Sequence, residues 1–345
     1  MSARGLGALG LGCILFLAES AQALASSSRA TSSATATSSV GATSATSAEF
    51  RATLALRWAP IHHQDVHTVG RNGLGGAADF ITAYDFDGDD DASNNWDNAG
   101  DPRFPLAAHA YYAVVETVTH WFITYTFYHP RDWSRRFLET EHENDTEGVM
   151  LAIHRDGSRF GALRAAVTVA HADFFSYLPE GSDWSQGQET VDGRLQLEPF
   201  DGELHPVTAQ QAETHALKAW PYFRIHRRGV VYYPSLTRAE VPDSTDDRHV
   251  YYRLRDVLEP GGLWQKREQR ELFARPGRMR GNRSGGCGRA VLWCVSNSAR
   301  MPWSWDDHDD RLPAGAMAKD PARLVRSYFS FGESLARRYQ FNPFR

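Results

Sequence analysis

Apolar runs of strand length recur along the chain from residue 51 onward, and most are rich in β-branched and aromatic residues. Runs of this composition, separated by Gly, Pro, Asn and Asp, are typical of β-strands. The segments that we interpret as strands are 51–61, two runs within 107–128 that part near 116–119, 145–153, 164–169, 230–233 and 249–252. The pattern therefore predicts a mainly β chain.

Two segments have a helical pattern instead. Thr208 is a suitable N-cap for a short helix over 208–217, with Gln211 three residues later. In 322–339 apolar residues recur at helical spacing after a proline that suits a first helical turn, and we expect this helix to pack on a sheet. Residues 178–213 are rich in Gly, Pro, Glu and Gln, which predicts a long surface excursion.

The N-terminal residues have the pattern of an export signal followed by a tether. Residues 1–25 combine Arg4, a short apolar run and an Ala-Leu-Ala cleavage site, as a secretory signal peptide does, with an uncleaved anchor as the alternative. Residues 26–48 are almost entirely Ser, Thr, Ala and Gly, and they cannot bury enough apolar area to fold. We therefore expect a secreted, extracellular protein with a single domain, with insertions, over 49–345.

Charge and composition narrow the choice of partners. The formal net charge of −5 argues against nucleic acid as a partner. Aromatic residues make up 12% of the chain, which suits sheet packing and carbohydrate stacking equally well. Cys287 and Cys294 follow the signal peptide, and in an exported chain their simplest interpretation is a disulfide. A metal pair would need further His or Cys ligands nearby.

Acidic side chains and an imidazole are concentrated between two of the predicted strands. In a strand over 145–153, Asp145 and Glu147 share the face that becomes apolar further along. Unpaired carboxylates on a core face are costly, and a bound cation or Arg131 would offset that cost. The alternative interpretation is a solvated acidic loop beside a strand.

The loop before this strand supplies two more candidate ligands. We expect Pro130 to end the earlier strand because it has no N–H for the ladder. Asp132 would then lie in the loop, and His142 would project from it because its parity is opposite to that of Asp145. Three carboxylates and one imidazole suit a divalent cation, with Mg²⁺ or Ca²⁺ favoured and Mn²⁺ as the alternative.

These motifs resemble those of the NPP1 family, the necrosis- and ethylene-inducing peptide 1-like proteins. Residues 125–132 (YTFYHPRD) resemble the family's Y-S-W-Y-x-P-K-D segment, and 142–147 (HENDTE) are similar to its signature H-R-H-D-W-E. The first His, the Asp and the Glu match, whereas Asn144 and Thr146 depart from the signature. Weaker counterparts follow in order at 169–177, 191–193 and 215–217, so the resemblance covers roughly residues 105–220.

The resemblance implies both a fold and a function. The fold would be a β-sandwich of antiparallel sheets with peripheral helices and long loops. The function would be that of a membrane-active, necrosis-inducing virulence protein whose cavity engages glycosylated sphingolipid headgroups. A divalent cation would be held by Asp132, His142, Asp145 and Glu147. The further ligand-binding candidates are Tyr128, Arg131, His171 and His215. The implied partner is a membrane glycolipid or an extracellular glycan, and no stable protein partner is implied.

Two other functions are open on the residues alone. In a metal-dependent hydrolase or lyase acting on an extracellular glycan or ester, the metal would activate water, and Glu143 or His171 would be the candidate base. A non-lytic carbohydrate-binding protein needs no catalytic base. The Gly-x-Ser-x-Gly, P-loop and His-Glu-x-x-His motifs are absent from the sequence. Whether any bond is cleaved is therefore open.

Three further polar clusters are candidates for binding. The acidic run around Gly88 resembles a calcium loop without the closing Glu of an EF-hand, and a second metal site or a solvated turn are its two interpretations. Its alternating carboxylates are Asp85, Asp87, Asp89 and Asp91. The histidines of 62–67, with Asp65, are expected in a polar loop, and metal ligation is the alternative interpretation. Residues 303–310 mix Trp with Asp, which suits sugar binding, a metal-supporting loop or a structural loop.

Overall fold

The computed structural model describes residues 46–134, 141–223, 225, 228–281 and 299–345. The chain divides into two units, 1–42 and 43–345, and the described residues belong to the second. The predicted signal peptide, almost all of the tether, and the predicted disulfide between Cys287 and Cys294 lie outside the described residues. Every helix in the described part of the chain is too short or too polar to span a bilayer.

The described chain is mainly β, as predicted. Its elements in chain order are α1 (Ala48–Trp58), β1 (Ile61–Asp65), η1 (Leu74–Asp79), α2 (Asn95–Asn98), β2 (His109–Thr117), β3 (His120–Asp132), β4 (His142–His154), β5 (Ala162–Ala170), β6 (Asp173–Pro179), β7 (Ser185–Gln186), β8 (Gly193–Leu195), β9 (Leu197–Phe200), β10 (Glu203–Gln210), β11 (Leu217–Ala219), β12 (Gly229–Ser235), β13 (Val250–Asp256), β14 (Phe273–Arg275), β15 (Arg278–Met279), α3 (Ala316–Lys319), α4 (Pro321–Tyr328), β16 (Phe329–Ser330) and β17 (Tyr339–Phe341).

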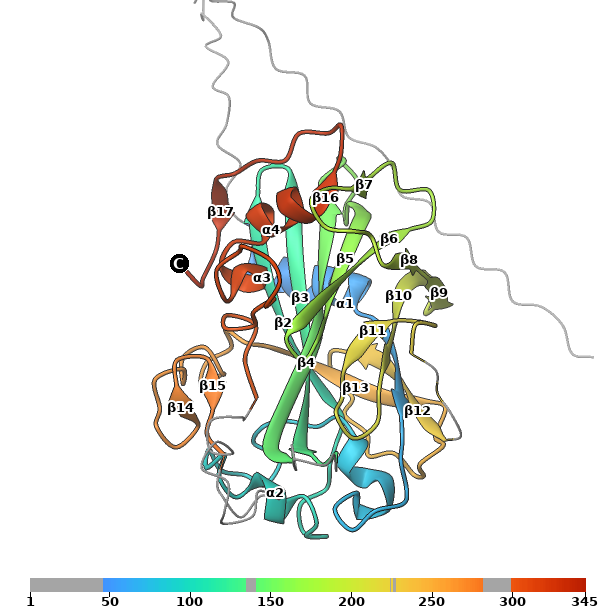
Figure 1. Cartoon of the computed structure of the whole chain (residues 1–345), viewed down its shortest axis with the longest axis vertical. Helices are drawn as coiled ribbons and strands as arrows, with labels where there is room; N and C mark the ends of the chain where they lie inside the picture. Colours follow the sequence, from blue (N-terminus) through green and yellow to red (C-terminus); the bar gives the residue numbers. More distant parts are fainter. Residues whose placement is uncertain (1–45, 135–140, 224, 226–227, 282–298) are drawn as a thin grey trace, which may run out of the picture. The chain divides into compact units, whose positions relative to one another are not determined.

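Most of these strands belong to one 13-stranded sheet (Figure 1). Its order is β11-β10-β1-β12-β13-β2-β3-β4-β5-β6-β8, with β17 beside β2 and β9 beside β10. The sheet curls, so that β11 near one end packs against β5 and β4. The pairs β1–β10, β12–β13, β13–β2 and β6–β8 are parallel. The expected antiparallel sheets of a sandwich are therefore replaced by a single mixed sheet, because long connections bring distant strands together in parallel.

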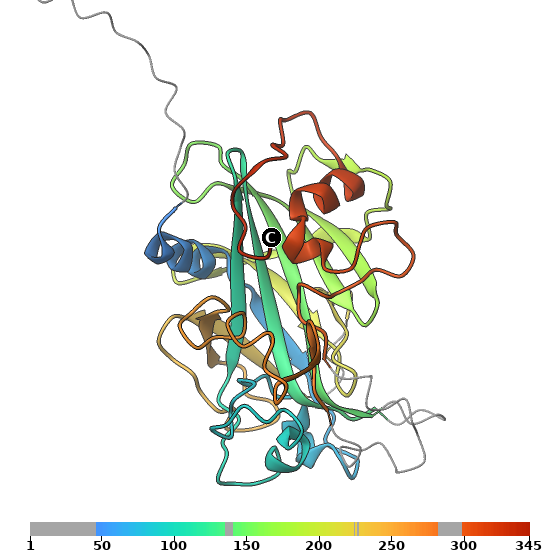
Figure 2. The same ribbon diagram turned by 90° about the vertical axis from the view of Figure 1, so that its left-hand side faces the viewer.

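The central strands β3 and β4 are buried on both faces, which explains why their sequences contain nearly continuous apolar runs. Tyr125 and Leu151 face a core inside the curl of the sheet, together with residues of α1 and β11–β13. Phe122 and Met150 face a second core, which the C-terminal segment with α3 and α4 covers. Figure 2 shows this segment, in red, lying against the green strands.

The segment 51–61 is a correction, because α1 replaces the expected first strand over most of its length. The Ser47 side chain accepts a hydrogen bond from the Phe50 N–H and caps this helix. Leu54, Ala55 and Trp58 then fall on one buried side at helical spacing. The run also contains Arg51, Thr53 and Arg57, and its apolar positions fit a helix with one buried side.

Two predicted helices are also corrected. Thr208 belongs to β10 and pairs with His62 of β1 and Ala219 of β11, so strand pairing prevails over the capping signal. The C-terminal helix α4 ends at Tyr328, and the chain continues as β16 and β17 instead of remaining helical to residue 339. In both cases backbone pairing with strands distant in sequence satisfies the N–H and C=O groups that a helix would have satisfied locally.

Candidate functional site

Strand β3 continues through Pro130 to Asp132, so the prediction that Pro130 ends the strand is wrong. The ladder to β4 pairs Arg131 with Glu143 and Asp132 with His142. On its other edge, β3 pairs with β2 only as far as Phe127. Pro130 therefore lies beyond the pairing of β3 with β2, and a proline is tolerated there. Asp132 and His142 face each other across the strand ends instead of projecting from a loop.

Asn144 explains how His142 and Asp145, which differ in parity, reach the same cavity. Its φ is +60°, a left-handed conformation that Asn tolerates better than most residues and that interrupts the alternation of the strand. Its side chain is held by four hydrogen bonds. Its Oδ1 accepts from Tyr128 Oη (2.6 Å) and Asn95 Nδ2 (2.8 Å), and its Nδ2 donates to the carbonyl oxygens of Ala92 (2.7 Å) and Arg280 (2.8 Å).

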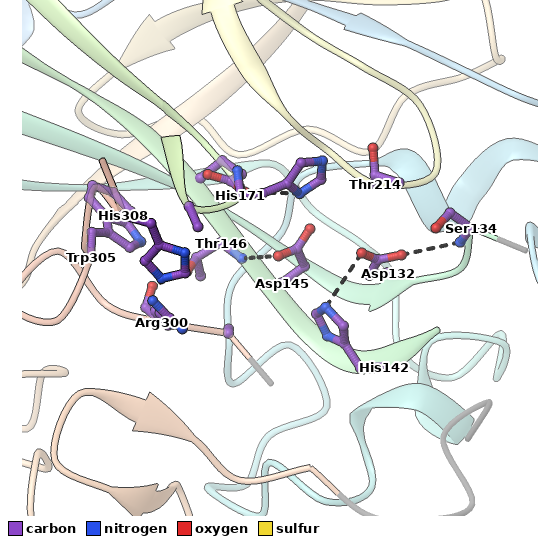
Figure 3. Close-up of a pocket in the computed structure, with 13 residues that line it drawn as sticks. Asp132, Ser134, His142, Asp145, Thr146, His171, Thr214, Arg300, Trp305 and His308 are labelled. Carbon is purple, nitrogen blue, oxygen red and sulfur yellow. Dashed lines mark hydrogen bonds and ion pairs between the residues drawn. The ribbon is translucent and has the colours of Figure 1, made fainter. Parts of the chain in front are cut away.

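The four predicted metal ligands line one cavity of about 380 Å³ (Figure 3). Its lining consists of Asp132, Ser134, His142, Asp145, Thr146, Glu147, His171, Ala172, Thr214, Ala299, Arg300, Trp305 and His308. His142 Nε2 and Asp132 Oδ2 are 3.4 Å apart. Over the described ranges, no three His, Cys, Asp or Glu side chains are already drawn together as a ligand set. The four predicted ligands therefore line one cavity, but their side chains do not converge on a single metal position.

His215 holds Asp145 from behind the cavity. Its Nδ1 lies 3.0 Å from Asp145 Oδ2, and its Nε2 lies 3.3 Å from Asp79 Oδ1. Burial lowers the pKa of His215, but its hydrogen bonds to the two carboxylates prevail and raise it to about 9. The same contact lowers the pKa of Asp145 to about 2 against the effect of burial. His215 thus positions Asp145 and does not line the cavity itself.

Glu147 is the least compensated group of the cavity. Its Oε1 accepts a hydrogen bond from the His171 N–H (2.8 Å), but its Oε2 is buried without a hydrogen-bond partner among the described residues. Burial and the charges of Asp145 and Asp132 raise the pKa of Glu147 well above its ordinary value. Such a carboxylate is stabilised by a nearby positive charge.

His142 presents one ring nitrogen to the cavity. Its Nδ1 lies 3.0 Å from the Asn144 carbonyl oxygen and donates to it, which leaves Nε2 facing Asp132. A backbone acceptor on one ring nitrogen is the arrangement that fixes the tautomer of metal-ligating histidines. Burial lowers the pKa of His142, but the Asp132 carboxylate prevails and raises it to about 9.

Three predicted residues have their side chains directed elsewhere. Tyr128 donates to Asn144, as described above. Arg131 stacks on Trp96 and donates from Nε to its carbonyl oxygen (2.8 Å). Glu143 accepts from the Trp96 N–H at 2.7 Å. None of the three lines the cavity, so of the two candidate bases only His171 does. The side chain of His171 is 52% exposed.

Several cavity residues were not identified from the sequence. Trp305 and His308 come from the segment 303–310, whose mixture of Trp and Asp suits several interpretations equally. Arg300 had no sequence signal, because it comes from a segment distant from β4 in the chain. Asp79, which is buried behind the cavity and does not line it, had none either; it accepts hydrogen bonds from Trp133 Nε1 (2.8 Å) and from the Glu213 N–H (2.9 Å), in addition to its contact with His215.

The other polar clusters are not drawn into this cavity. In the acidic run, Asp85 pairs with Arg255 and Asp90 with Lys266, each at 2.6 Å. His62 belongs to strand β1, is fully buried, and stacks on Phe127 with ring centroids 3.9 Å apart. The prediction of a polar loop at 62–67 is therefore wrong for its first residues, which are part of the sheet.

Comparisons with known proteins give only distant similarities. No protein-family model matches the chain, and no curated protein matches it. Among solved structures, NLPPya in complex with mannosamine has a TM-score of 0.35 and 12% identity, over 83% of this chain and 94% of that one. A structure described as a toxin fold for microbial attack and plant defense has a TM-score of 0.30 and 15% identity, over 62% and 76%. Necrosis and Ethylene inducing Protein 2 from the causal agent of cocoa's Witches Broom disease has a TM-score of 0.27 and 16% identity, over 51% and 69%. Similarity at this level does not assign the chain to a family.

Proposed function

We propose that this protein binds a divalent cation in the cavity of Asp132, His142, Asp145 and Glu147, and that the bound cation recognises the sugar headgroup of a membrane glycolipid. The observation that carries the proposal is Glu147, whose buried and unpartnered Oε2 lies among three other predicted ligands. The resemblance of 125–132 and 142–147 to the NPP1 motifs supports the same residues independently of the geometry.

The donor set suits a hard divalent cation. Carboxylate oxygens are preferred by Mg²⁺ and Ca²⁺, and a single imidazole among them is also compatible with Mn²⁺. When bound, the cation would supply positive charge for the crowded carboxylates and open positions for hydroxyl or carboxylate oxygens of a sugar. His142 is oriented for this role by the Asn144 carbonyl oxygen, and Asp145 by His215.

The opening of the cavity offers groups that can bind a sugar. His171 and His308 both line it and are exposed. Arg300 adds a cationic side chain, which would attract an anionic headgroup. Secretion, suggested by residues 1–25, would bring this cavity to an outer membrane surface, where damage to the bilayer is the proposed outcome.

Calorimetric titration with MgCl₂, CaCl₂ and MnCl₂ tests the cation site. Glu147→Gln should weaken binding at least about tenfold, since it removes the charge of one ligand. Asp201→Asn, on an exposed turn, is the control and should bind like the wild type. Equal affinities in wild type and Glu147→Gln would contradict the proposal.

Dye leakage from vesicles that contain plant glycosylated sphingolipids tests the membrane step. Leakage should require the cation, stop with chelator, and be lost in Glu147→Gln. Leakage that persists with chelator would contradict a cation-dependent mechanism.

A hydrolase is the second candidate function, because His171 lies beside Glu147 at the opening of the cavity, with its Nδ1 3.9 Å from Glu147 Oε1. In that case His171 would act as the base towards a water molecule. Release of sugar or fatty acid from the same vesicles, lost in His171→Ala, would favour the hydrolase over headgroup binding alone.

A further inference from the structure

A second cavity, of about 310 Å³, lies beside the first and is lined by five carboxylates. They are Asp173, Glu189, Asp192, Asp307 and Asp309. None of the five forms an ion pair with a Lys, Arg or His within the described ranges. Five like charges that share one small cavity repel one another unless a positive charge joins them.

Asp307 is the buried member of this cluster. It is only 7% exposed, whereas Asp173, Asp192 and Asp309 are exposed. Its Oδ2 accepts a hydrogen bond from Tyr328 Oη, but its Oδ1 is buried and has no hydrogen-bond partner among the described residues. An unpartnered buried carboxylate oxygen costs free energy of folding, and it therefore points to a missing partner.

The walls of the cavity are fixed by hydrogen bonds and do not rest on a single loop. Asp192 Oδ2 accepts from the Ser176 N–H (2.7 Å), and the Asp192 N–H donates to the Ser176 carbonyl oxygen (2.9 Å), which ties the segment 189–192 to β6. The His308 N–H donates to the Ala172 carbonyl oxygen (3.0 Å), which ties the segment 305–310 to the start of the same strand.

We propose that this cavity is a calcium site in which Asp307 and Asp309 ligate the ion from one side and Glu189 and Asp192 from the other. Only oxygen donors line it, and an all-oxygen set with several carboxylates is the coordination that Ca²⁺ prefers. The site is separate from the first cavity and requires neither His142 nor Glu147.

The position of the site gives it a structural role. Within one short segment, Trp305 and His308 line the first cavity, whereas Asp307 and Asp309 line the second. On the other wall, His171 lines the first cavity and Asp173 the second. A calcium ion bound by Asp307 and Asp309 would therefore fix the segments that carry His171 and His308.

Calcium titration of the full chain by calorimetry, together with terbium luminescence excited through tyrosine, tests the site. Tyr328 contacts Asp307 directly and would sensitise a bound Tb³⁺ ion. Asp307→Asn should lower the affinity for Ca²⁺ at least about tenfold and abolish the sensitised luminescence. Asp306→Asn is the matched control, because this neighbouring carboxylate does not line the cavity, and it should keep both signals.

Two further variants make the outcome decisive. An Asn side chain at position 307 retains an acceptor for Tyr328, so the thermal midpoint of Asp307→Asn without calcium should not fall. If Asp307→Asn fails to fold, Asp309→Asn replaces it in the test, because the side chain of Asp309 is exposed. In Glu147→Gln the calcium signal of the second cavity should persist, which separates this site from the first. Wild-type affinity in both Asp307→Asn and Asp309→Asn would overturn the proposal and indicate a proton shared between the two carboxylates. Equal loss in Asp306→Asn would overturn it in favour of a general charge effect.

Discussion

Two regions of this protein are both rich in carboxylates but have different surroundings. The run 85–91 contains five aspartates, and the stretch 142–147 contains one aspartate and two glutamates. In the run, Asp85 forms an ion pair with Arg255, and Asp90 forms one with Lys266. In the cavity, Glu147 keeps a buried oxygen without a partner. Two carboxylates of the run therefore have cationic partners in the fold, whereas Glu147 Oε2 has no hydrogen-bond partner among the described residues. Whether the remaining aspartates of the run bind a cation stays a prediction.

Removing the Asp145 carboxylate should have the largest effect on cation affinity and on stability. Asp145→Ala removes one proposed ligand and leaves the buried His215 with Asp79 as its remaining carboxylate. We expect cation affinity to fall about 100-fold and the free energy of unfolding to fall by about 3 kcal/mol, as for other broken buried pairs. Titration and urea unfolding measure the two quantities. Asp145→Asn keeps an acceptor for His215, and a loss of stability equal to that of Asp145→Ala would contradict this explanation.

Alanine substitutions at two glycines, one beside the cavity and one in the acidic run, test how tightly the two regions are packed. A Cβ on Gly148 would lie 2.1 Å from the Tyr125 carbonyl oxygen and 2.5 Å from Trp305, so Gly148→Ala should cost about 3 kcal/mol through overpacking. A Cβ on Gly88 in the acidic run would meet nothing within 4 Å, and its φ of +91° leaves only backbone strain of about 1 kcal/mol. Urea unfolding of both variants is the measurement. Equal losses would show that the cavity wall is not tightly packed.

The pH dependence of stability without cation tests the uncompensated charge directly. Because the folded-state pKa of Glu147 is raised above 4.5, the folded chain holds this proton more tightly than the unfolded chain does. Its contribution to stability is therefore complete below pH 4.5 and is lost as pH rises towards the folded-state pKa. In chelator, Glu147→Gln should lose less stability over this range than the wild type does. Parallel melting curves for the two proteins across pH would refute this expectation.

Removing a counter-charge from the acidic run should have the smallest effect. Lys266 Nζ contacts Asp90 and also the buried Tyr84 through its Oη (3.0 Å), and the side chains of Lys266 and Asp90 are partly exposed to solvent. Lys266→Gln should therefore reduce the free energy of unfolding by about 0.5 kcal/mol, as for other exposed pairs. Its affinity for cation at the main cavity should equal that of the wild type. A change in that affinity would mean that the two regions are coupled.

Local sequence patterns were sufficient to predict several of the strands. The strands at 107–128, 145–153, 164–169, 230–233 and 249–252 were all expected and all form. Their apolar and β-branched residues are buried by sheet formation whatever the order of the strands. The set Asp132, His142, Asp145 and Glu147 was also expected from the sequence, and the structure brings these residues to one cavity.

Tertiary structure decided what depends on distant partners. At 208–217 the capping signal of Thr208 predicted a helix, but pairing with β1 and β11 makes Thr208 part of strand β10. The left-handed φ of Asn144 is stabilised by groups at 92, 95, 128 and 280. Arg300, Trp305 and His308 reach the cavity only through the packing of the C-terminal segment on the sheet. Contacts of long sequence separation leave no local periodicity, and for that reason the sequence indicated the proposed ligands but not the walls of the site.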